Sequence, residues 1–186
     1  VCSEADVIGA FEASIARFGK IDAVVVNAGI VGPALPLAEM SIERMRKILD
    51  TNVLGALLVA REAARVLPKS SPSTSVVFVS SAAARLGSPF EYVDYAASKG
   101  AIDTLTLGLS KELAAEGIRV NGVRPGLIAT EIHASGGDPG RAERLGATVP
   151  MARAGTAQEV AQTILWFCSD EASYCTGAIL DVAGGR

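Results

Sequence analysis

Apolar residues follow two alternating patterns along the chain, one typical of helices and the other of buried strands. From Val7 to Phe18 they recur at steps of three and four, which indicates an amphipathic helix. Ser3 stands where an N-cap is expected, and Gly19 ends the pattern. The residues from Ile21 to Val26 then form a short apolar run, typical of a strand buried on both faces. The beginning of the chain is therefore predicted as a helix followed by a strand.

The same alternation continues to the last residues. A second helix is predicted from its cap Ser41 to about Leu67, and Pro68 with the Ser/Pro-rich stretch Ser70–Ser75 ends it. That stretch is too short to be a domain linker. The inward-facing stripe of this helix is predicted to include Met45, Ile48, Leu49, Ala56 and Ala60. The remaining predictions are a strand at Val76–Val79, a helix at Tyr92–Ala115, a strand at Ile118–Val123, a polar stretch at Ala134–Arg144, a helix at Ala157–Cys168 and a strand at Ala178–Val182.

Strands that alternate with helices indicate βα units, and βα units build a parallel sheet. We therefore predict an α/β fold in which residues 1–186 form a single domain. Ligands of such sheets bind beyond the carboxyl ends of the strands. Three predicted strands end at Asn27-Ala28-Gly29, at Ser80-Ser81 and at Pro125-Gly126. These three stretches should meet at one crevice.

Composition narrows the function classes. Hydrophobic residues make up 49% of the 186 residues, yet no apolar run approaches the roughly 18 residues that a membrane span needs. A net charge of -3 argues against a nucleic-acid partner, which would require a basic face. Cys2, Cys168 and Cys175 lack a Cys-x-x-Cys spacing, and free thiols are a commoner case than a disulfide or a metal site. We expect a cytoplasmic protein that binds neither nucleic acid nor membrane.

Tyr95 and Lys99 stand four residues apart on a predicted helix, so they share one face of it. A phenol has a pKa near ~10 and is a poor base at neutral pH. A neighbouring ammonium favours the phenolate and lowers that pKa, which would let Tyr95 exchange a proton with a substrate oxygen. An ordinary surface pair has the same spacing, and on spacing alone it is the commoner case.

Ser81 and Asn52 add to the case for a catalytic site. Ser81 lies at the end of a predicted strand, fourteen residues before Tyr95, where its hydroxyl could hold a carbonyl oxygen against the phenol. Without Tyr95, the simpler interpretation would be that Ser80 and Ser81 cap the strand end. Asn52 falls on the apolar stripe of its helix, four residues after Ile48. A buried Asn needs hydrogen-bond partners, and a structural and a functional role are equally compatible with this position.

In order and approximate spacing, these motifs resemble those of the short-chain dehydrogenase/reductases, and the resemblance covers the whole chain. It implies a doubly wound parallel sheet of Rossmann type. It also implies a nicotinamide-dependent oxidoreductase that uses NAD or NADP on a small-molecule alcohol or carbonyl, with a 3-oxoacyl-thioester reductase as the alternative. Glu91-Tyr92-x-x-Tyr95 and the segment His133–Gly140 are further similar to a bacterial branch of oxidoreductases and sugar dehydrogenases.

The resemblance assigns roles to individual residues. Tyr95 would be the catalytic acid/base and Ser81 would orient the substrate oxygen. Lys99 would bind the nicotinamide ribose and lower the pKa of the phenol, while Asn52 would hold a water in a proton relay. The remaining assignments concern the cofactor crevice, which would be lined by Asn27, Ala28, Gly29, Pro125 and Gly126, with Ile128 and Thr130 facing the nicotinamide carboxamide.

Two further expectations follow from the same resemblance. Family members form dimers and tetramers, so we expect a homodimer or homotetramer that assembles through the two long helices. His133, the only histidine, falls in the segment that would fold over the substrate. A solvated loop histidine is the commoner case, and we predict that for His133.

The Gly-rich turn that the family places after its first strand to receive a pyrophosphate has no match here. Gly136–Gly140 is glycine-rich, but no strand precedes it and Pro139 interrupts it. We therefore expect the C-terminal three-quarters of such an enzyme, without its first two βα units of roughly 60 residues. The residue that separates NAD from NADP would lie in those units. The strand ending at Val26 would become a bare sheet edge, so the alternative is a non-catalytic remnant that only self-associates.

Overall fold

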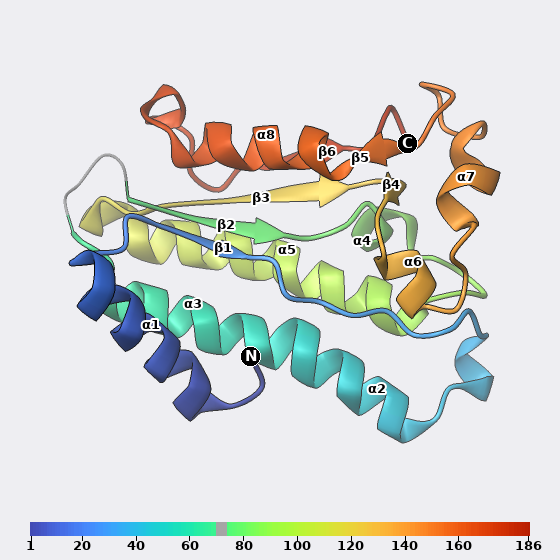
Figure 1. The fold of residues 1–186 in the computed structure, drawn as a ribbon, viewed down its shortest axis with the longest axis horizontal. Helices are drawn as coiled ribbons and strands as arrows, with labels where there is room; N and C mark the ends of the chain where they lie inside the picture. The colour runs from blue at the N-terminus through green and yellow to red at the C-terminus, as the bar shows by residue number, and fades with distance from the viewer. Residues whose placement is uncertain (70–73) are drawn as a thin grey trace.

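A parallel sheet with helices on both faces forms the centre of the computed structural model, which describes residues 1–69 and 74–186 (Figure 1). The four strands lie in the order β1-β2-β3-β6, and every neighbouring pair is parallel. Their bounds are Ala23–Val26 for β1, Ser75–Val79 for β2, Arg119–Pro125 for β3 and Ile179–Val182 for β6. A short second sheet pairs β4 (Ile128–Ala129) with β5 (Gly155–Thr156). The α/β prediction with a doubly wound parallel sheet is confirmed.

The four predicted helical regions are helical, with bounds that differ by a few residues, and three short helices that were not predicted occur at Ala83–Leu86, Ile132–Ser135 and Arg141–Gly146. The α-helices are α1 (Glu4–Phe18), α2 (Ile42–Leu49), α3 (Gly55–Val66), α4 (Ala83–Leu86), α5 (Val93–Leu113), α6 (Ile132–Ser135), α7 (Arg141–Gly146) and α8 (Ala157–Cys168). Short 3-10 turns occur at η1 (Leu37–Glu39), η3 (Ala114–Glu116) and η4 (Asp170–Ala172), and a π-helical turn at η2 (Asp50–Leu54). The Ser3 side chain accepts from the Asp6 amide at the start of α1, and Gly19 ends that helix with a φ of 84°.

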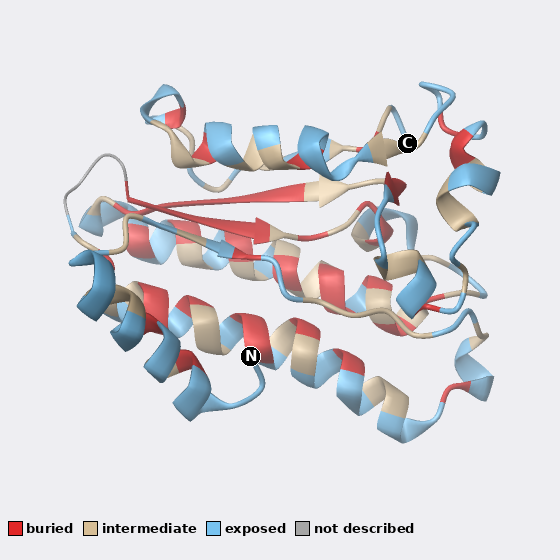
Figure 2. Cartoon of the chain, in the orientation of Figure 1, coloured by how far each residue is buried: buried red, intermediate tan, exposed pale blue. Residues whose placement is uncertain are grey.

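Two hydrophobic clusters cover the two faces of the sheet. Val76 and Phe78 of β2 pack with α1, α3 and α5, whereas Val77 of the same strand packs with Val160 and Phe167 of α8. Successive side chains of a strand point to opposite faces, so a strand buried on both faces reads as a continuous apolar run. Figure 2 shows β2 and most of β3 as buried, and the helix faces turned toward the sheet as buried or half-buried.

The polar stretch Ala134–Arg144, for which no helix was predicted, contains the end of α6 and the start of α7. Two expectations about the elements need correction. The long second helix is interrupted by the π-helical turn η2. Leu49 does not face the core and is 47% exposed, because it lies about 100° around the helix from the buried Ile48. Of the stretch Ser70–Ser75, residues 70–73 lie outside the described residues.

The described residues contain no helix that is both long enough and apolar enough to cross a membrane. All three cysteines are free, as expected. No group of three or more His, Cys, Asp or Glu side chains within residues 1–69 and 74–186 has the arrangement of a metal site.

Candidate active site

A cavity of about 1150 Å³ lies beyond the carboxyl ends of β1, β2 and β3. The three turns that follow these strands all line it, as expected. Of the residues predicted for the site, those on the cavity wall are Asn27, Ala28, Gly29, Ser81, Tyr95, Lys99, Pro125, Gly126, Ile128 and Thr130. The cavity therefore lies outside the carboxyl ends of the parallel strands, where ligands of such sheets bind.

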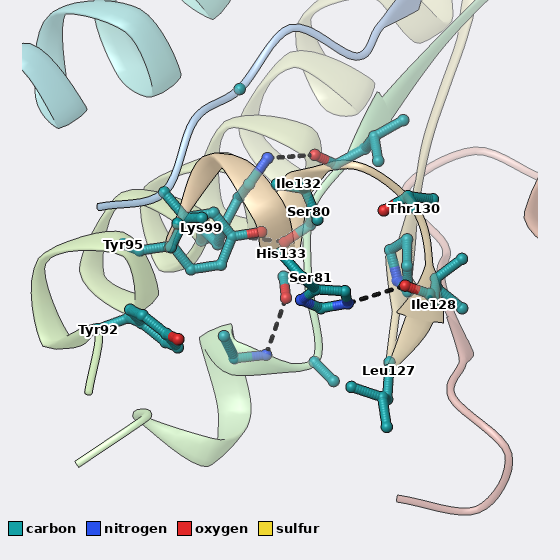
Figure 3. A pocket seen from close by; sticks show the side chains of 18 of the residues that line it. Ser80, Ser81, Tyr92, Tyr95, Lys99, Leu127, Ile128, Thr130, Ile132 and His133 are labelled. Atoms are coloured by element: carbon teal, nitrogen blue, oxygen red, sulfur yellow. Dashed lines mark hydrogen bonds between the residues drawn. The ribbon is translucent and has the colours of Figure 1, made fainter. Parts of the chain in front are cut away.

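Ser81, Tyr95 and Lys99 come together on one wall of this cavity (Figure 3). Tyr95 and Lys99 lie on successive turns of α5, and Ser81 follows β2. The Lys99 ammonium lies 5.7 Å from the centroid of the Tyr95 ring. The Ala83 amide donates to Ser81 Oγ at 3.1 Å, and a side-chain hydrogen bond joins Ser81 to Tyr95.

The Tyr95 phenol has a pKa above its ordinary value, and burial is the main cause. The hydrogen bond with Ser81 opposes this effect and lowers the pKa by less. The predicted lowering of this pKa by Lys99 is therefore wrong for the structure described. Lys99 Nζ donates to the Val79 carbonyl at 2.7 Å, and desolvation of the phenolate is the dominant effect on Tyr95. At neutral pH Tyr95 carries its proton.

Burial also shifts Lys99, whose side chain is almost entirely enclosed. Desolvation of the ammonium lowers the pKa of Lys99 to about 8, and the nearby negative charge of Asp103 partly opposes this. An ammonium has three donors, and among the described residues Lys99 donates to the Val79 carbonyl alone. Two N–H groups of a buried cation therefore remain for a ligand.

Asn52 does not line the cavity, although it lies close behind the wall. It is 1% exposed, within η2. Its Oδ1 accepts from the Ile30 amide at 2.8 Å, and its Nδ2 donates to the Ile30 carbonyl at 2.9 Å and to Ser98 Oγ at 3.0 Å. The amide side chain thus joins the turn after β1 to α5, and each of its polar atoms has a partner.

The glycines in the turns after β1 and β3 lie close to other parts of the chain. A Cβ at Gly29 would lie 3.2 Å from Lys99 Nζ, and one at Gly126 would lie 2.7 Å from the Ala183 Cα atom.

His133 is hydrogen-bonded through its Nε2 to the carbonyl of Ile128, on β4, at 2.8 Å. The prediction of a solvated loop histidine is wrong: His133 lies on α6, is half-buried and lines the cavity.

Sequence reasoning missed one pair of charged residues on the wall. Arg141 of α7 forms two hydrogen bonds with Glu91, at 3.0 and 2.6 Å, and its guanidinium lies 5.1 Å from the centroid of the Tyr92 ring. Fifty residues separate the two charges, so no local pattern could have paired them. The Arg141 side chain is only 12% exposed because it lies between the carboxylate and the ring.

The cavity wall suits a nicotinamide nucleotide. The two unused N–H groups of Lys99 can donate to hydroxyl oxygens such as those of a ribose. Gly29 has no Cβ, and this leaves room beside the Lys99 ammonium. A cavity of about 1150 Å³ is large enough for a nicotinamide riboside and a small substrate together.

Known proteins resemble the chain over its whole length. A family profile described as enoyl-(acyl carrier protein) reductase matches residues 1–186. The oxidoreductase YgfF of Escherichia coli is 52% identical over 188 residues, which cover all of this chain and 76% of YgfF. Glucose 1-dehydrogenase 2 of Bacillus subtilis is 35% identical, with all of this chain and 71% of the relative covered.

Solved structures agree with these relatives. A 3-ketoacyl-(acyl-carrier-protein) reductase from Brucella melitensis complexed with NADH superimposes with a TM-score of 0.91 at 31% identity, covering all of this chain and 75% of that one. A short-chain dehydrogenase of the glucose/ribitol type from the same organism has a TM-score of 0.84 at 34% identity, with 99% and 71% covered. With the fold, the wall residues and these relatives together, the chain belongs to the short-chain dehydrogenase/reductases, which are NAD(P)-dependent oxidoreductases.

Proposed function

We propose that this protein interconverts an alcohol and a carbonyl, with the hydride carried by NAD or NADP and the proton carried by Tyr95. The observation that carries the proposal is the convergence of Ser81, Tyr95 and Lys99 on the wall of one cavity. In the sequence alone each of the three residues has a common non-catalytic interpretation, as a strand cap for Ser81 and as a surface pair for Tyr95 and Lys99. Their meeting at a cavity large enough for cofactor and substrate favours the catalytic one.

In the reduction direction, Tyr95 donates its proton to the substrate oxygen. Its raised pKa keeps the phenol protonated at neutral pH, which suits a proton donor. Ser81 Oγ accepts from the Ala83 amide and is hydrogen-bonded to Tyr95, so its hydroxyl would turn from the phenol to a substrate oxygen that enters the cavity. We assign the Ser81 proton to the substrate carbonyl oxygen, which Ser81 thereby holds against the phenol. Oxidation runs the same proton steps in reverse.

The remaining wall residues would hold the cofactor, which supplies or accepts a hydride when bound. Lys99 would donate its two unused N–H groups to the ribose hydroxyls. The turn Asn27-Ala28-Gly29 would form the floor beside the ribose, and Pro125-Gly126 would form the opposite side. Ile128 and Thr130 would face the carboxamide.

Asn52 has a supporting role in this proposal. Its side chain fixes Ile30 and Ser98, and Ser98 Oγ in turn donates to the Tyr95 carbonyl at 2.7 Å. This places Asn52 behind the first turn of α5, the helix that carries Tyr95 and Lys99. A water held at Asn52 would extend the proton path from Lys99 toward solvent.

Tyr95→Phe tests the assignment because it removes only the hydroxyl. We expect turnover to fall by about 10²-fold or more, with the folded state and cofactor binding retained. The assay follows NADH and NADPH absorbance with glucose and with a 3-oxoacyl thioester. Tyr174→Phe, at a fully exposed tyrosine, is the matched control and should keep wild-type turnover. A folded Tyr95→Phe variant with near-normal turnover would refute the role of Tyr95.

Two substrate classes compete in that assay. The similarity to glucose 1-dehydrogenases favours a sugar or polyol, and the similarity to the Brucella 3-ketoacyl-(acyl-carrier-protein) reductase favours a 3-oxoacyl thioester. We place the sugar-dehydrogenase-like assignment first, because the segments around Tyr92 and His133 resemble that branch. Higher kcat/KM for the thioester than for glucose would reverse this order.

A further inference from the structure

A series of alternating charges leads from Lys99 toward the surface. Asp103 follows Lys99 by one turn of α5, and its Oδ2 accepts from Arg124 Nε at 2.9 Å. Arg124 stands on β3 opposite Asp181 of β6, and Arg124 Nη1 lies 3.6 Å from Asp181 Oδ1. Asp181 in turn pairs with Arg85 at 2.8 Å. The series therefore joins the catalytic helix to two strands and to α4.

Asp103 and Arg124 are the enclosed part of this series. Their side chains are 14% and 18% exposed, whereas that of Asp181 is 36% exposed. Arg124 engages one carboxylate oxygen of Asp103, and the other, Oδ1, is buried without a hydrogen-bond partner among the described residues. A buried carboxylate oxygen without a partner is costly, so its retention requires an explanation.

The position of Asp103 relative to Lys99 supplies one. Residues four apart on a helix have Cβ atoms about 5–6 Å apart on the same face. Lys99 is 4% exposed, and its ammonium donates to a neutral carbonyl. Without a negative charge nearby, a cation so enclosed would lose its proton readily.

The surroundings of Lys99 offer no other such charge among the described residues. On α5, Tyr95 precedes it by one turn as a neutral phenol. The turn after β1 contributes Gly29, η2 contributes Asn52, and β2 contributes the Val79 carbonyl. Asp103 is the charged group whose field acts on the ammonium, and it raises the pKa of Lys99 against the desolvation that lowers it.

We propose that Asp103, oriented by Arg124, is a positioning residue that keeps the ammonium of Lys99 protonated in the buried site. Asp103 does not line the cavity, so it acts through Lys99 and not on a substrate. Its use in catalysis rests on the proposed function, but its effect on Lys99 does not. The two are therefore separable by experiment.

The direct readout is the titration of Lys99 by NMR of protein labelled with ¹³C in its lysine side chains. The chain has five lysines, and Lys99→Arg identifies the Lys99 signal by its loss. In Asp103→Asn we expect the midpoint of the Lys99 titration to fall by about one pH unit below the wild-type value. Asp103→Ser, a second neutral replacement that crowds nothing, should give the same fall. Asp103→Glu keeps the charge and should restore most of the wild-type midpoint.

Asp181→Asn is the matched control. It also removes a carboxylate from Arg124, but this carboxylate lies on the side of Arg124 that is away from Asp103 in the series of charges. We therefore expect the midpoint of the Lys99 titration to stay unchanged. Folded Asp103→Asn and Asp103→Ser variants with a wild-type Lys99 midpoint would overturn the proposal. So would an equal fall in Asp181→Asn, or failure of both neutral Asp103 variants to fold, because either would indicate a structural role. Absence of enzymatic activity in the wild type would count against the proposed function alone.

Discussion

At the scale of single residues, Lys99 shows how a functional site opposes stability. An ammonium that is 4% exposed has lost most of its hydration, and its pKa falls from 10.5 to about 8. The folded chain therefore binds this proton less tightly than the unfolded chain does. Keeping the charge inside costs folding free energy, while it leaves two donors for a ligand.

This cost has a defined pH dependence. Because the folded-state pKa lies below the unfolded value, the cost is fully present below about pH 8 and disappears as the pH rises toward 10.5. From this group alone, the wild type should gain about 2 kcal/mol of unfolding free energy between pH 7.5 and pH 10, relative to Lys99→Met. Urea unfolding of both proteins at the two pH values measures the difference. Parallel changes in both proteins would contradict the buried-ammonium account.

At the scale of elements, α8 covers one face of the sheet and is held at its C-terminal end by β3. The Arg119 guanidinium donates to the Phe167 carbonyl at 2.7 Å and to the Ser169 carbonyl at 3.1 Å. The last carbonyls of a helix have no intrahelical partner. A buried cation at this end donates hydrogen bonds to them and also interacts favourably with the negative end of the helix dipole. This contact positions the helix whose start lines the active-site cavity.

Arg119→Met should therefore lower the stability of the fold, since it takes the guanidinium donor from the buried Phe167 carbonyl, while the Ser169 carbonyl keeps the Ala172 amide. We expect a loss of about 2–4 kcal/mol, or roughly 5–12 °C in the melting temperature. Arg61→Met is the control, because its ion pair with Glu4 is exposed and should contribute less than about 1 kcal/mol. Thermal unfolding followed by circular dichroism compares the two. Equal melting temperatures would show that α8 does not depend on this contact.

At the scale of the whole molecule, two kinds of surface have no covering partner among residues 1–69 and 74–186. β1 is the outer strand of the described sheet, pairs with β2 alone and has Val25 43% exposed. The long helices also present large apolar side chains, with Ile42, Leu57 and Leu107 between 43% and 53% exposed. Exposed apolar surface of this kind marks interaction sites.

We propose that the chain assembles as a homodimer or homotetramer through α2, α3 and α5. Sedimentation at micromolar concentration should show the assembly, and combining Leu57→Glu with Leu107→Glu should shift it toward the monomer. Leu37→Glu, at another exposed leucine outside these helices, should leave the assembly unchanged. A wild-type monomer under these conditions would contradict the proposal, and indefinite aggregation would favour pairing through the β1 edge instead.

The local features of the chain were determined by its sequence alone. Ser3 and Gly19 bound the first helix because capping and positive φ are properties of a few neighbouring residues. The apolar runs predicted the buried strands, and parallel topology then placed their ends, with Ser81 and Gly126, around one cavity. Tyr95 and Lys99 share one face of α5 because four residues make about one helical turn, so their proximity depends on the helix alone.

Only the tertiary structure decided the properties that depend on distant contacts and on water. The pKa of Tyr95 is raised and not lowered, because the extent of burial is set by elements from across the chain. Arg141 pairs with Glu91 across fifty residues, and the partial burial of His133 beside the cavity is likewise set by chain folding that no local pattern encodes. The π-helical turn Asp50–Leu54 also depends on packing, because the helical stripe in the sequence does not show where such a turn is inserted.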